Sequence, residues 1–224
     1  MKILFIADIH GFLEGLERVK EYLGESGIHA VFLMGDYSLG FKDTARNKTD
    51  AETAVAELKD RAGVYAIPGN CDFPLVVDLF EKYGANAHEK TVVLDGVSFV
   101  CLGGSNETPF GTPFEMEEDY IRQKLDSLLG RAKTGKTVLV THFPPKDTAC
   151  DNVPDVGHVG SQALRNAIET YQPDICTCSH IHECAGKTDR IGQTRIYNVG
   201  PLRGGNAIAL DTTGLAVHYE IINR

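Results

Sequence analysis

The chain opens with residues 1–11, which read Met-Lys-Ile-Leu-Phe-Ile-Ala-Asp-Ile-His-Gly. Residues 3–7 form a continuous apolar run without polar alternation, which predicts a strand buried on both faces, as in a parallel sheet. The run stops at Asp8 and His10, where a central strand would leave the sheet. In open α/β sheets ligands bind at this carboxyl edge. A carboxylate oxygen beside an imidazole nitrogen suits a transition metal. Whether the later strands also end in such residues therefore decides how strong this indication is.

Apolar runs and helical patterns alternate through the first third of the chain. They predict helices over 13–22, 49–58 and 74–83, and strands over 30–34 and 63–67. A β-α-β-α-β order implies right-handed crossovers and a parallel sheet.

The pairing changes at Asp95-Gly96, because this dipeptide between apolar runs is a strong hairpin signal. We therefore expect either a mixed sheet or two sheets. Further helices are predicted over 117–129 and 161–171, and further strands over 90–94, 97–102, 137–141, 174–178, 187–191, 194–198, 207–210 and 215–222, the last four as antiparallel strands. The pattern indicates an α/β fold, with two packed sheets and helices outside. Residues 103–113 form a long, turn-rich loop, which is typical of a functional loop.

Length and composition are those of an ordinary globular protein. The chain has 224 residues, 42% of them hydrophobic and 24% charged, and we expect a single domain spanning 1–224. Its net charge of -9 does not favour a broad nucleic-acid footprint or an anionic membrane surface. No segment approaches the roughly 18 apolar residues of a spanning helix, and the start lacks a signal-peptide pattern. We expect a cytoplasmic protein.

Five predicted strands are each followed by polar residues that can bind a metal ion. These residues are Asp8 and His10, Asp36, Asn70, His142, and His180 with His182. Any one of them alone is explained well enough as a cap, a turn residue or a satisfied buried polar group. Seven such residues at five strand ends are far more specific, and their number fits two metal ions. A carboxylate such as Asp36 can bridge two cations, which gives the two-metal arrangement of phosphoryl transfer.

These motifs resemble those of the calcineurin-like metallophosphoesterase superfamily, in its small single-domain bacterial and archaeal form. The matching positions, in order, are Asp8-x-His10, Gly35-Asp36, Gly69-Asn70, His142 and His180-x-His182, and the turn Asn198-Val199-Gly200 resembles the closing turn of the family. The resemblance implies a four-layer sandwich of two mixed β-sheets flanked by α-helices. It also implies a dinuclear centre: Asp8, His10 and His182 would bind one metal, Asn70, His142 and His180 the other, and Asp36 would bridge them. Two divalent ions are expected, with Mn²⁺ first and Fe, Zn²⁺ or Ni²⁺ compatible.

The activity implied is hydrolysis of a phosphoester by a water activated between two metal ions. One departure bears on the mechanism, because many family members have a leaving-group acid, His, where this chain has Cys71. A thiol is a poorer general acid, so we expect phosphodiesters ahead of monoesters, with Asp72 or a water held by His10 as a substitute acid. A second departure, Ser179 in place of Gly, is expected to have little effect. The predicted catalytic residues are Asp8, His10, Asp36, Asn70, His142 and Asp72.

Two other functions stay open at this stage. A binding scaffold that has lost turnover would tolerate missing ligands, whereas a nuclease would favour a basic surface. The expected partner is a small phosphoester, with neither a membrane nor nucleic acid expected and a homo-oligomer possible. For His158 and Arg203 we expect loop packing and a solvated loop position ahead of substrate contact. Phe110 and Phe114 of the long loop would either wall a substrate pocket or supply the apolar packing of the loop.

Overall fold

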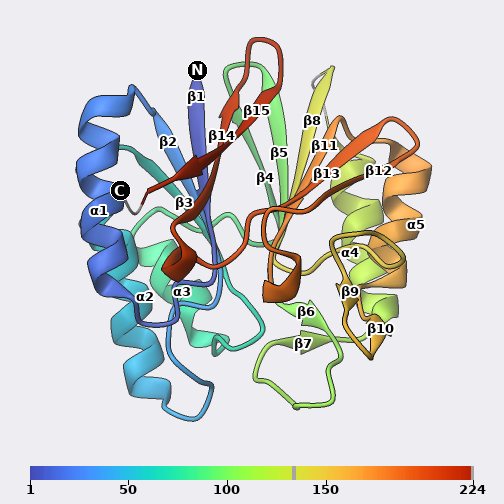
Figure 1. Ribbon diagram of the computed structural model, residues 1–224, viewed down its shortest axis with the longest axis horizontal. Coiled ribbons are helices and arrows are strands. Elements are labelled where there is room, and N and C mark those ends of the chain that lie inside the picture. The colour runs from blue at the N-terminus through green and yellow to red at the C-terminus, as the bar shows by residue number, and fades with distance from the viewer. Residues whose placement is uncertain (133–134, 223–224) are drawn as a thin grey trace.

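The computed structural model describes residues 1–132 and 135–222. The described chain folds into two large β-sheets that pack face to face, with helices on both outer sides (Figure 1). Both sheets are mixed, so the four-layer sandwich expected from the sequence is confirmed.

The first sheet has the strand order β15-β14-β1-β2-β3. Its strands are β1 (Lys2–Ile6), β2 (Ala30–Met34), β3 (Gly63–Ile67), β14 (Asn206–Asp211) and β15 (Ala216–Ile221). The three N-terminal strands pair in parallel, as the alternating strand and helix pattern predicts. Strands β14 and β15 then complete the sheet in antiparallel pairing beside β1.

The second sheet has the order β12-β13-β11-β8-β5-β4. Its strands are β4 (Lys90–Leu94), β5 (Val97–Leu102), β8 (Lys136–Thr141), β11 (Ile175–Cys178), β12 (Thr188–Ile191) and β13 (Thr194–Asn198). The hairpin across Asp95 forms as expected between β4 and β5. One expectation is wrong in part: β13 pairs antiparallel with β12 but parallel with β11. This long-range pairing leaves no local signature in the sequence.

Helices cover the outer face of each sheet (Figure 1). They are α1 (Leu13–Ser26), α2 (Thr44–Leu58), α3 (Leu75–Lys82), α4 (Glu118–Leu129) and α5 (Gln162–Tyr171). The first three pack on the first sheet, and α4 and α5 pack on the second. Helix α2 begins five residues earlier than predicted, because the Asp43 side chain accepts a hydrogen bond from the Arg46 amide at 3.0 Å and caps the helix. None of the helices in the described residues is long and apolar enough to cross a membrane.

Short elements complete the described ranges. They are the strands β6 (Ser105–Asn106), β7 (Glu115–Met116), β9 (Asn152–Val153) and β10 (Gly157–His158), and the 3-10 helices η1 (His182–Cys184) and η2 (Leu202–Gly204). All of them lie toward one end of the sandwich (Figure 1).

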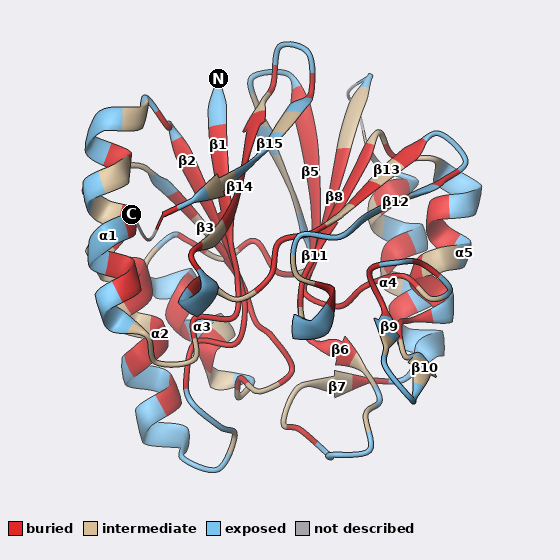
Figure 2. Ribbon diagram, viewed as in Figure 1, coloured by how far each residue is buried: buried red, intermediate tan, exposed pale blue. Residues whose placement is uncertain are grey.

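The layer between the sheets is the most completely buried part of the protein (Figure 2). Phe32 stacks on Phe5 with ring centroids 5.2 Å apart, and on Phe99 of the opposite sheet at 5.0 Å. Aromatic pairs of this kind contribute beyond their buried area, so they hold the two sheets in a fixed relation. The strand ends that carry the polar residues are thereby fixed as well.

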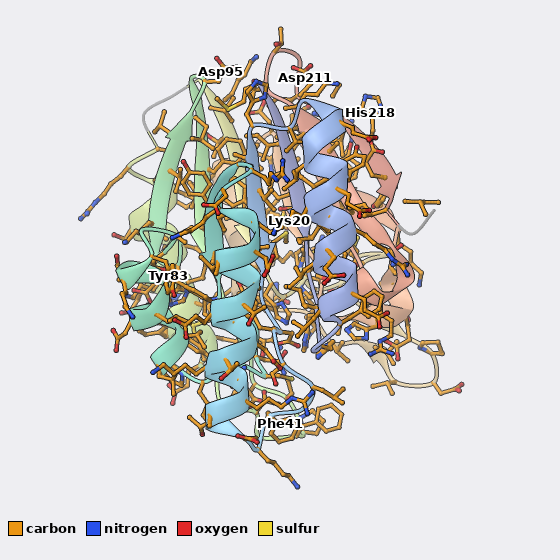
Figure 3. All side chains as sticks on the ribbon, turned by 90° about the vertical axis from the view of Figure 1, so that its left-hand side faces the viewer. Lys20, Phe41, Tyr83, Asp95, Asp211 and His218 are labelled. Carbon is orange, nitrogen blue, oxygen red and sulfur yellow. The ribbon has the colours of Figure 1, made fainter. Side chains whose placement is uncertain are left out.

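The carboxyl ends of β1, β2, β3, β8 and β11 meet at one end of the sandwich, since the residues that follow them are in contact. Phe41, in the loop after β2, lies at this end in Figure 3, whereas Asp95 and Asp211 lie at the opposite end. The geometry of the fold thus brings the ligand-type residues together.

Candidate metal centre

The structure places all seven predicted ligand residues in the segments that follow strands, at the same end of the two sheets; His182 is the first residue of η1 and the other six lie in loops. Six of them form two groups in which the possible ligand atoms lie within 4.8 Å of one another. The first group is Asp8, His10 and His182, and the second is Asp36, His142 and His180.

The first group converges on one buried carboxylate oxygen. Oδ1 of Asp8 lies 3.4 Å from Nε2 of His182 and 4.0 Å from Nε2 of His10. It is buried and has no hydrogen-bond partner among the residues that the structure describes, which is costly for a carboxylate unless a cation binds there. An unpartnered buried oxygen facing two imidazole nitrogens therefore fits a metal ion.

The second group contains the predicted amide ligand as well. Nε2 of His142 lies 3.6 Å from Oδ2 of Asp36 and 3.1 Å from Oδ1 of Asn70. The Asn70 amide nitrogen donates to Oγ1 of Thr112 at 3.0 Å, so the amide oxygen faces the group. The His180 ring lies 5.2 Å from that of His142, centroid to centroid. The donor set is again mixed nitrogen and oxygen.

Asp36 stands between the two groups. Its Oδ2 lies 3.6 Å from Nε2 of His142 and 3.7 Å from Nε2 of His10, which belongs to the other group. Its Oδ1 is held by the Cys71 amide at 2.9 Å. One carboxylate oxygen is therefore fixed by backbone and the other is shared by both groups, as a bridging ligand requires.

Main-chain carbonyls orient two of the imidazoles. Nδ1 of His142 lies 2.7 Å from the Met34 carbonyl, and Nδ1 of His10 lies 3.2 Å from that of Ser38. A carbonyl can only accept, so Nδ1 carries the proton in each ring and Nε2 faces the site. Such partners set the tautomer that a metal ligand needs.

The backbone at four of these positions is left-handed, which non-glycine residues seldom adopt. The φ values are 49° at Asp8, 45° at His10, 55° at Asp36 and 66° at His180. Hydrogen bonds between the adjacent loops hold this conformation; for example, the Asp8 amide donates to the Gly35 carbonyl at 3.1 Å. Strain that the surroundings impose in this way is typical of functional sites.

Two positions accept only glycine because the loops touch. A Cβ at Gly35 would lie 2.2 Å from the Gly69 nitrogen, and a Cβ at Gly69 would lie 2.1 Å from Oδ1 of Asp36. The glycines of the Gly-Asp and Gly-Asn motifs are therefore required for the same reason, because the two loops that carry them pack directly against each other.

Ser179 was not expected to matter, yet it is buried and its hydroxyl donates a hydrogen bond to Oδ2 of Asp8. The His180 amide donates to the same oxygen at 3.4 Å. These contacts leave Oδ1 of Asp8 as the free oxygen. Asn198 also supports this loop, since its amide nitrogen lies 3.3 Å from the carbonyls of Ser179 and Ile181. Only the resemblance of the closing turn pointed to Asn198.

Asp72 is fully buried, and its carboxylate accepts hydrogen bonds from four partners. The donors are the amides of Asp36 at 2.8 Å, Tyr37 at 3.1 Å and Gly69 at 2.7 Å, and the Asn47 side chain at 2.7 Å. Burial and the negative charge of Asp36 raise its pKa to about 6. Through these hydrogen bonds the Asp72 carboxylate links the loops after β2 and β3 to helix α2.

Charge pairing dominates the electrostatics of the second group. Burial alone would raise the pKa of Asp36, but the charge of His142 holds it well below its usual range. Burial would likewise lower the pKa of His142, yet Asp36 raises it to about 9. Desolvation and the His142 charge lower the pKa of His180 to about 4. His180 is therefore neutral at pH 7, the protonation state that a metal ligand needs.

The charged groups that act on the Cys71 thiol are carboxylates, and that of Asp36 has the largest effect. Burial and the charge of Asp36 raise the pKa of its thiol well above the usual range. The thiol therefore stays protonated at neutral pH, and it gives up its proton reluctantly.

Two hollows open on either side of His182. The Leu39 hollow, of about 630 Å³, is lined by residues that include Leu39, Phe41, Cys71 and Arg203. The Phe110 hollow, of about 400 Å³, is lined by Glu107–Phe110, Val153, Val156, Val159 and His180–Glu183. Both reach the ligand groups, since His182 lines each of them.

The four other residues considered in the sequence analysis as possible substrate contacts lie in different surroundings. Phe110 lines its hollow, but Phe114 packs edge-on against His88 at 5.3 Å, away from the ligand groups. His158 contacts Oδ1 of Asp151 at 2.7 Å, which favours loop packing over substrate contact. The Arg203 guanidinium lies 5.3 Å from the Phe12 ring centroid, at the edge of the Leu39 hollow.

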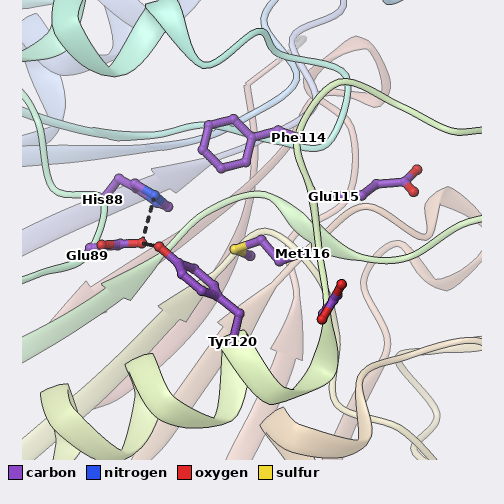
Figure 4. Close-up of a pocket in the computed structure, with 7 residues that line it drawn as sticks. His88, Glu89, Phe114, Glu115, Met116 and Tyr120 are labelled. Carbon is purple, nitrogen blue, oxygen red and sulfur yellow. Dashed lines mark hydrogen bonds and ion pairs between the residues drawn. The ribbon is translucent and has the colours of Figure 1, made fainter.

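A third hollow, of about 390 Å³, lies beside Phe114 and contains none of the seven predicted ligands (Figure 4). Glu89 contacts two other residues that line this hollow. Its carboxylate accepts a hydrogen bond from the Tyr120 hydroxyl at 2.6 Å and lies 3.6 Å from Nε2 of His88. Nδ1 of His88 accepts from the Gly103 amide at 3.0 Å. These contacts fix the start of the loop over residues 103–113.

Comparison with known proteins places this geometry in context. A family model described as calcineurin-like phosphoesterase matches residues 1–184. An uncharacterised protein of Methanocaldococcus jannaschii is 36% identical over 206 residues, which cover 90% of this chain and 88% of that protein. Phosphodiesterase YfcE of Escherichia coli K12 is 36% identical over 74 residues, or 32% of this chain and 40% of that enzyme.

Similarity to solved structures extends over the whole chain. The crystal structure of a Thermus thermophilus protein superposes with a TM-score of 0.75 at 18% identity, and the match covers 99% of both chains. At this identity the likeness concerns the fold alone.

Proposed function

The chain belongs to the calcineurin-like phosphoesterase family, and from this premise we propose that it is a dinuclear metal-dependent phosphodiesterase. The proposal assigns Asp8, His10 and His182 to one ion and Asn70, His142 and His180 to the other. Asp36 would bridge the two ions. Residues 1–224 would act as a single domain.

One observation carries the proposal: Oδ2 of Asp36 lies almost equally far from His10 and His142, at 3.7 and 3.6 Å. A buried carboxylate oxygen shared in this way by imidazoles of two groups is placed as a bridging ligand would be. The free, buried Oδ1 of Asp8 gives independent support. A scaffold without turnover would not need to retain every donor.

When bound, two divalent cations in such a site supply Lewis-acid polarisation and a water activated at neutral pH. The Asp36 carboxylate, fixed by the Cys71 amide, would set the spacing of the two binding positions. The Met34 and Ser38 carbonyls keep His142 and His10 in the tautomer that ligation requires. The buried strand ends prevent these side chains from relaxing as charge develops on the substrate, which is the electrostatic preorganisation that lowers a barrier.

The preference for diesters with a good leaving group rests on the surroundings of Cys71. Its thiol lies beside Asp36 and keeps its proton, so it is a weak acid for a departing alkoxide. Asp72 already accepts four hydrogen bonds and is fully buried, which favours a positioning role over proton transfer. Esters whose leaving group needs little protonation are therefore the expected substrates.

The test combines metal content with turnover. The protein is purified without added metal, stripped with a chelator and reconstituted with Mn²⁺, then assayed with bis(p-nitrophenyl) phosphate and p-nitrophenyl phosphate. Asp36→Asn and His142→Ala are compared with the matched variants Asp95→Asn and His218→Ala. Asp95 and His218 lie at the opposite end of the molecule (Figure 3).

We expect two Mn²⁺ per chain, diester turnover ahead of monoester turnover, and loss of both metal and turnover only in the first pair of variants. Two bound ions without hydrolysis of either ester would favour a scaffold. No metal binding at all would overturn the assignment of the centre. Salt-sensitive DNA binding with DNA cleavage would favour a nuclease.

A further inference from the structure

The large apolar side chains that are most exposed in the described ranges gather around the candidate metal centre. Phe110 is 73% exposed, Val156 71% and Leu39 64%. All three line the two hollows that meet at His182. Single exposed apolar residues need no explanation, but their concentration beside a site indicates that something binds there.

The Phe110 hollow has apolar walls and a polar floor. Phe110 comes from the loop after β6 and Val156 from the segment between β9 and β10, whereas His180 and His182 follow β11. A group attached to a phosphorus atom between the two ligand groups would therefore reach these walls directly. Continuity with the candidate ligands favours a part of the substrate as the occupant over a second copy of the chain.

Hydrogen bonds fix the loop that presents Phe110. The Glu115 carboxylate accepts from the amides of Thr108 at 3.1 Å and Thr112 at 2.7 Å, and the Phe110 amide donates to Oγ1 of Thr108 at 3.2 Å. Oγ1 of Thr112 also accepts from Asn70, a predicted ligand. The position of the loop is thereby coupled to the metal centre.

The opposite wall is tied to the same loop. The Asn106 side chain donates to the Val159 carbonyl at 3.2 Å. Buried Asp151 holds the second loop by accepting from the amides of Thr148 at 2.8 Å and Gly160 at 2.9 Å. Both walls are therefore built in advance, so a ligand would bind without first ordering them.

Charge limits what the hollow can hold. The exposed carboxylates of Glu107 and Glu183 line it, and no Lys or Arg of the described part of the chain is among its lining residues. A second phosphate at this position would be repelled. An uncharged ring would bury apolar area against Phe110 and Val156, with the geometry that aromatic groups favour.

We propose that the Phe110 hollow binds one ester group of the substrate and that this group is uncharged and aromatic. The proposal rests on the phosphodiesterase function proposed above and narrows its substrates to diesters with an aromatic ester group. Oligonucleotides, whose neighbouring phosphates would meet Glu107 and Glu183, are disfavoured.

Two phosphonates test the proposal by binding, without turnover. Phenylphosphonate and methylphosphonate share the head group and differ only in one substituent. Calorimetry on the full chain loaded with Mn²⁺ gives the ratio of their dissociation constants. We expect roughly tenfold tighter binding of phenylphosphonate, falling to about twofold in Phe110→Ser and Val156→Ser. Ile221→Ser, at an equally apolar and 63% exposed position on β15, should keep the tenfold ratio.

An unchanged ratio in Phe110→Ser and Val156→Ser would overturn the proposal, as would loss of selectivity in Leu39→Ser instead. Failure of the loaded protein to bind either phosphonate would do the same. A change of oligomeric state in light scattering, with the ratio intact, would make the hollow an interface between copies. Failure of the proposed function looks different: phosphonate selectivity would persist while bis(p-nitrophenyl) phosphate is not hydrolysed.

Discussion

The carboxylate of Asp72 accepts a hydrogen bond of 2.8 Å from the backbone amide of Asp36, the residue that stands between the two ligand groups. The same oxygen accepts from the Gly69 amide at 2.7 Å. The position of Asp36, the proposed bridging residue, is therefore set by the buried carboxylate of Asp72, which lines neither the Leu39 nor the Phe110 hollow. This relation, and others like it, gives testable consequences.

Asp72→Asn should act on folding and metal binding together. The amide keeps one oxygen but turns an NH₂ toward backbone donors, so at least one buried donor loses its partner. We expect the free energy of unfolding to fall by about 2–3 kcal/mol, measured by urea denaturation of the metal-free protein. Asp78→Asn, at an exposed position on α3, should change it by less than about 0.5 kcal/mol. Full stability with a lost basic limb of the pH–rate profile would instead identify Asp72 as a general acid, because an acid is active only while it is protonated.

Ser179→Ala should weaken metal binding without unfolding the protein. The substitution removes the hydroxyl that holds Oδ2 of Asp8, and such supporting contacts contribute roughly 10–100-fold in metal affinity. Competition with a chelator measures the Mn²⁺ affinity. Ser26→Ala is the matched control, because the Ser26 hydroxyl has no hydrogen-bond partner within residues 1–132 and 135–222. Equal affinity in the two variants would show that the contact does not orient Asp8.

Metal affinity should rise with pH. The Asp36 charge raises the pKa of His142 to about 9, so a metal ion must displace a proton from Nε2 at lower pH. We expect Mn²⁺ affinity to increase about tenfold per pH unit between pH 6.5 and 8.5, with proton release seen by calorimetry in buffers of different ionisation enthalpy. His218→Gln should keep this slope. An affinity independent of pH would contradict the His142–Asp36 pairing.

The same pair has the opposite effect on the metal-free protein. A pKa raised in the folded state stabilises the protein fully below about 6.5, the unfolded value. This contribution is lost as the pH rises toward about 9. Metal-free protein should therefore melt at progressively lower temperature over this range, whereas His142→Ala should show a flatter profile. A melting temperature that rises over the same range would refute the direction of the shift.

Gly69→Ala should displace Asp36. The new Cβ would lie 2.1 Å from Oδ1 of Asp36 and 2.5 Å from its amide nitrogen, so the two loops must separate. We expect more than tenfold weaker Mn²⁺ binding, and a loss of stability of about 1–3 kcal/mol. Gly24→Ala, in α1, meets no atom within 4 Å and should be neutral or stabilising by up to about 1 kcal/mol. Unchanged metal binding in Gly69→Ala would mean that the loops adapt.

Cys71 offers a test of the leaving-group preference. Cys71→Ser should leave hydrolysis of bis(p-nitrophenyl) phosphate within about threefold, because a thiol with a raised pKa contributes little acid catalysis. Cys71→His should raise the turnover of diesters with an alkyl leaving group by roughly tenfold or more. A much larger loss for the alkyl diester than for bis(p-nitrophenyl) phosphate in Cys71→Ser would show that the thiol itself protonates the leaving group.

The sequence by itself determined the order of the main elements and named the candidate ligands. Period-two and period-3.6 patterns depend on which side chains face the core, and that is a local property, so strands such as Val97–Leu102 were predicted with correct bounds. The identity of Asp36 or His142 as a ligand candidate followed from chemistry at a strand end.

Only the tertiary structure decided how these residues meet. The parallel pairing of β13 with β11, the contact of Ser179 with Asp8 and the four donors to Asp72 all join segments distant in the chain. Their energies depend on contacts between segments that are far apart in the chain, and no short stretch of sequence contains both partners. The same holds for the Phe110 hollow, because Phe110 and Val156 become neighbours of His182 only when two loops close over the strand ends.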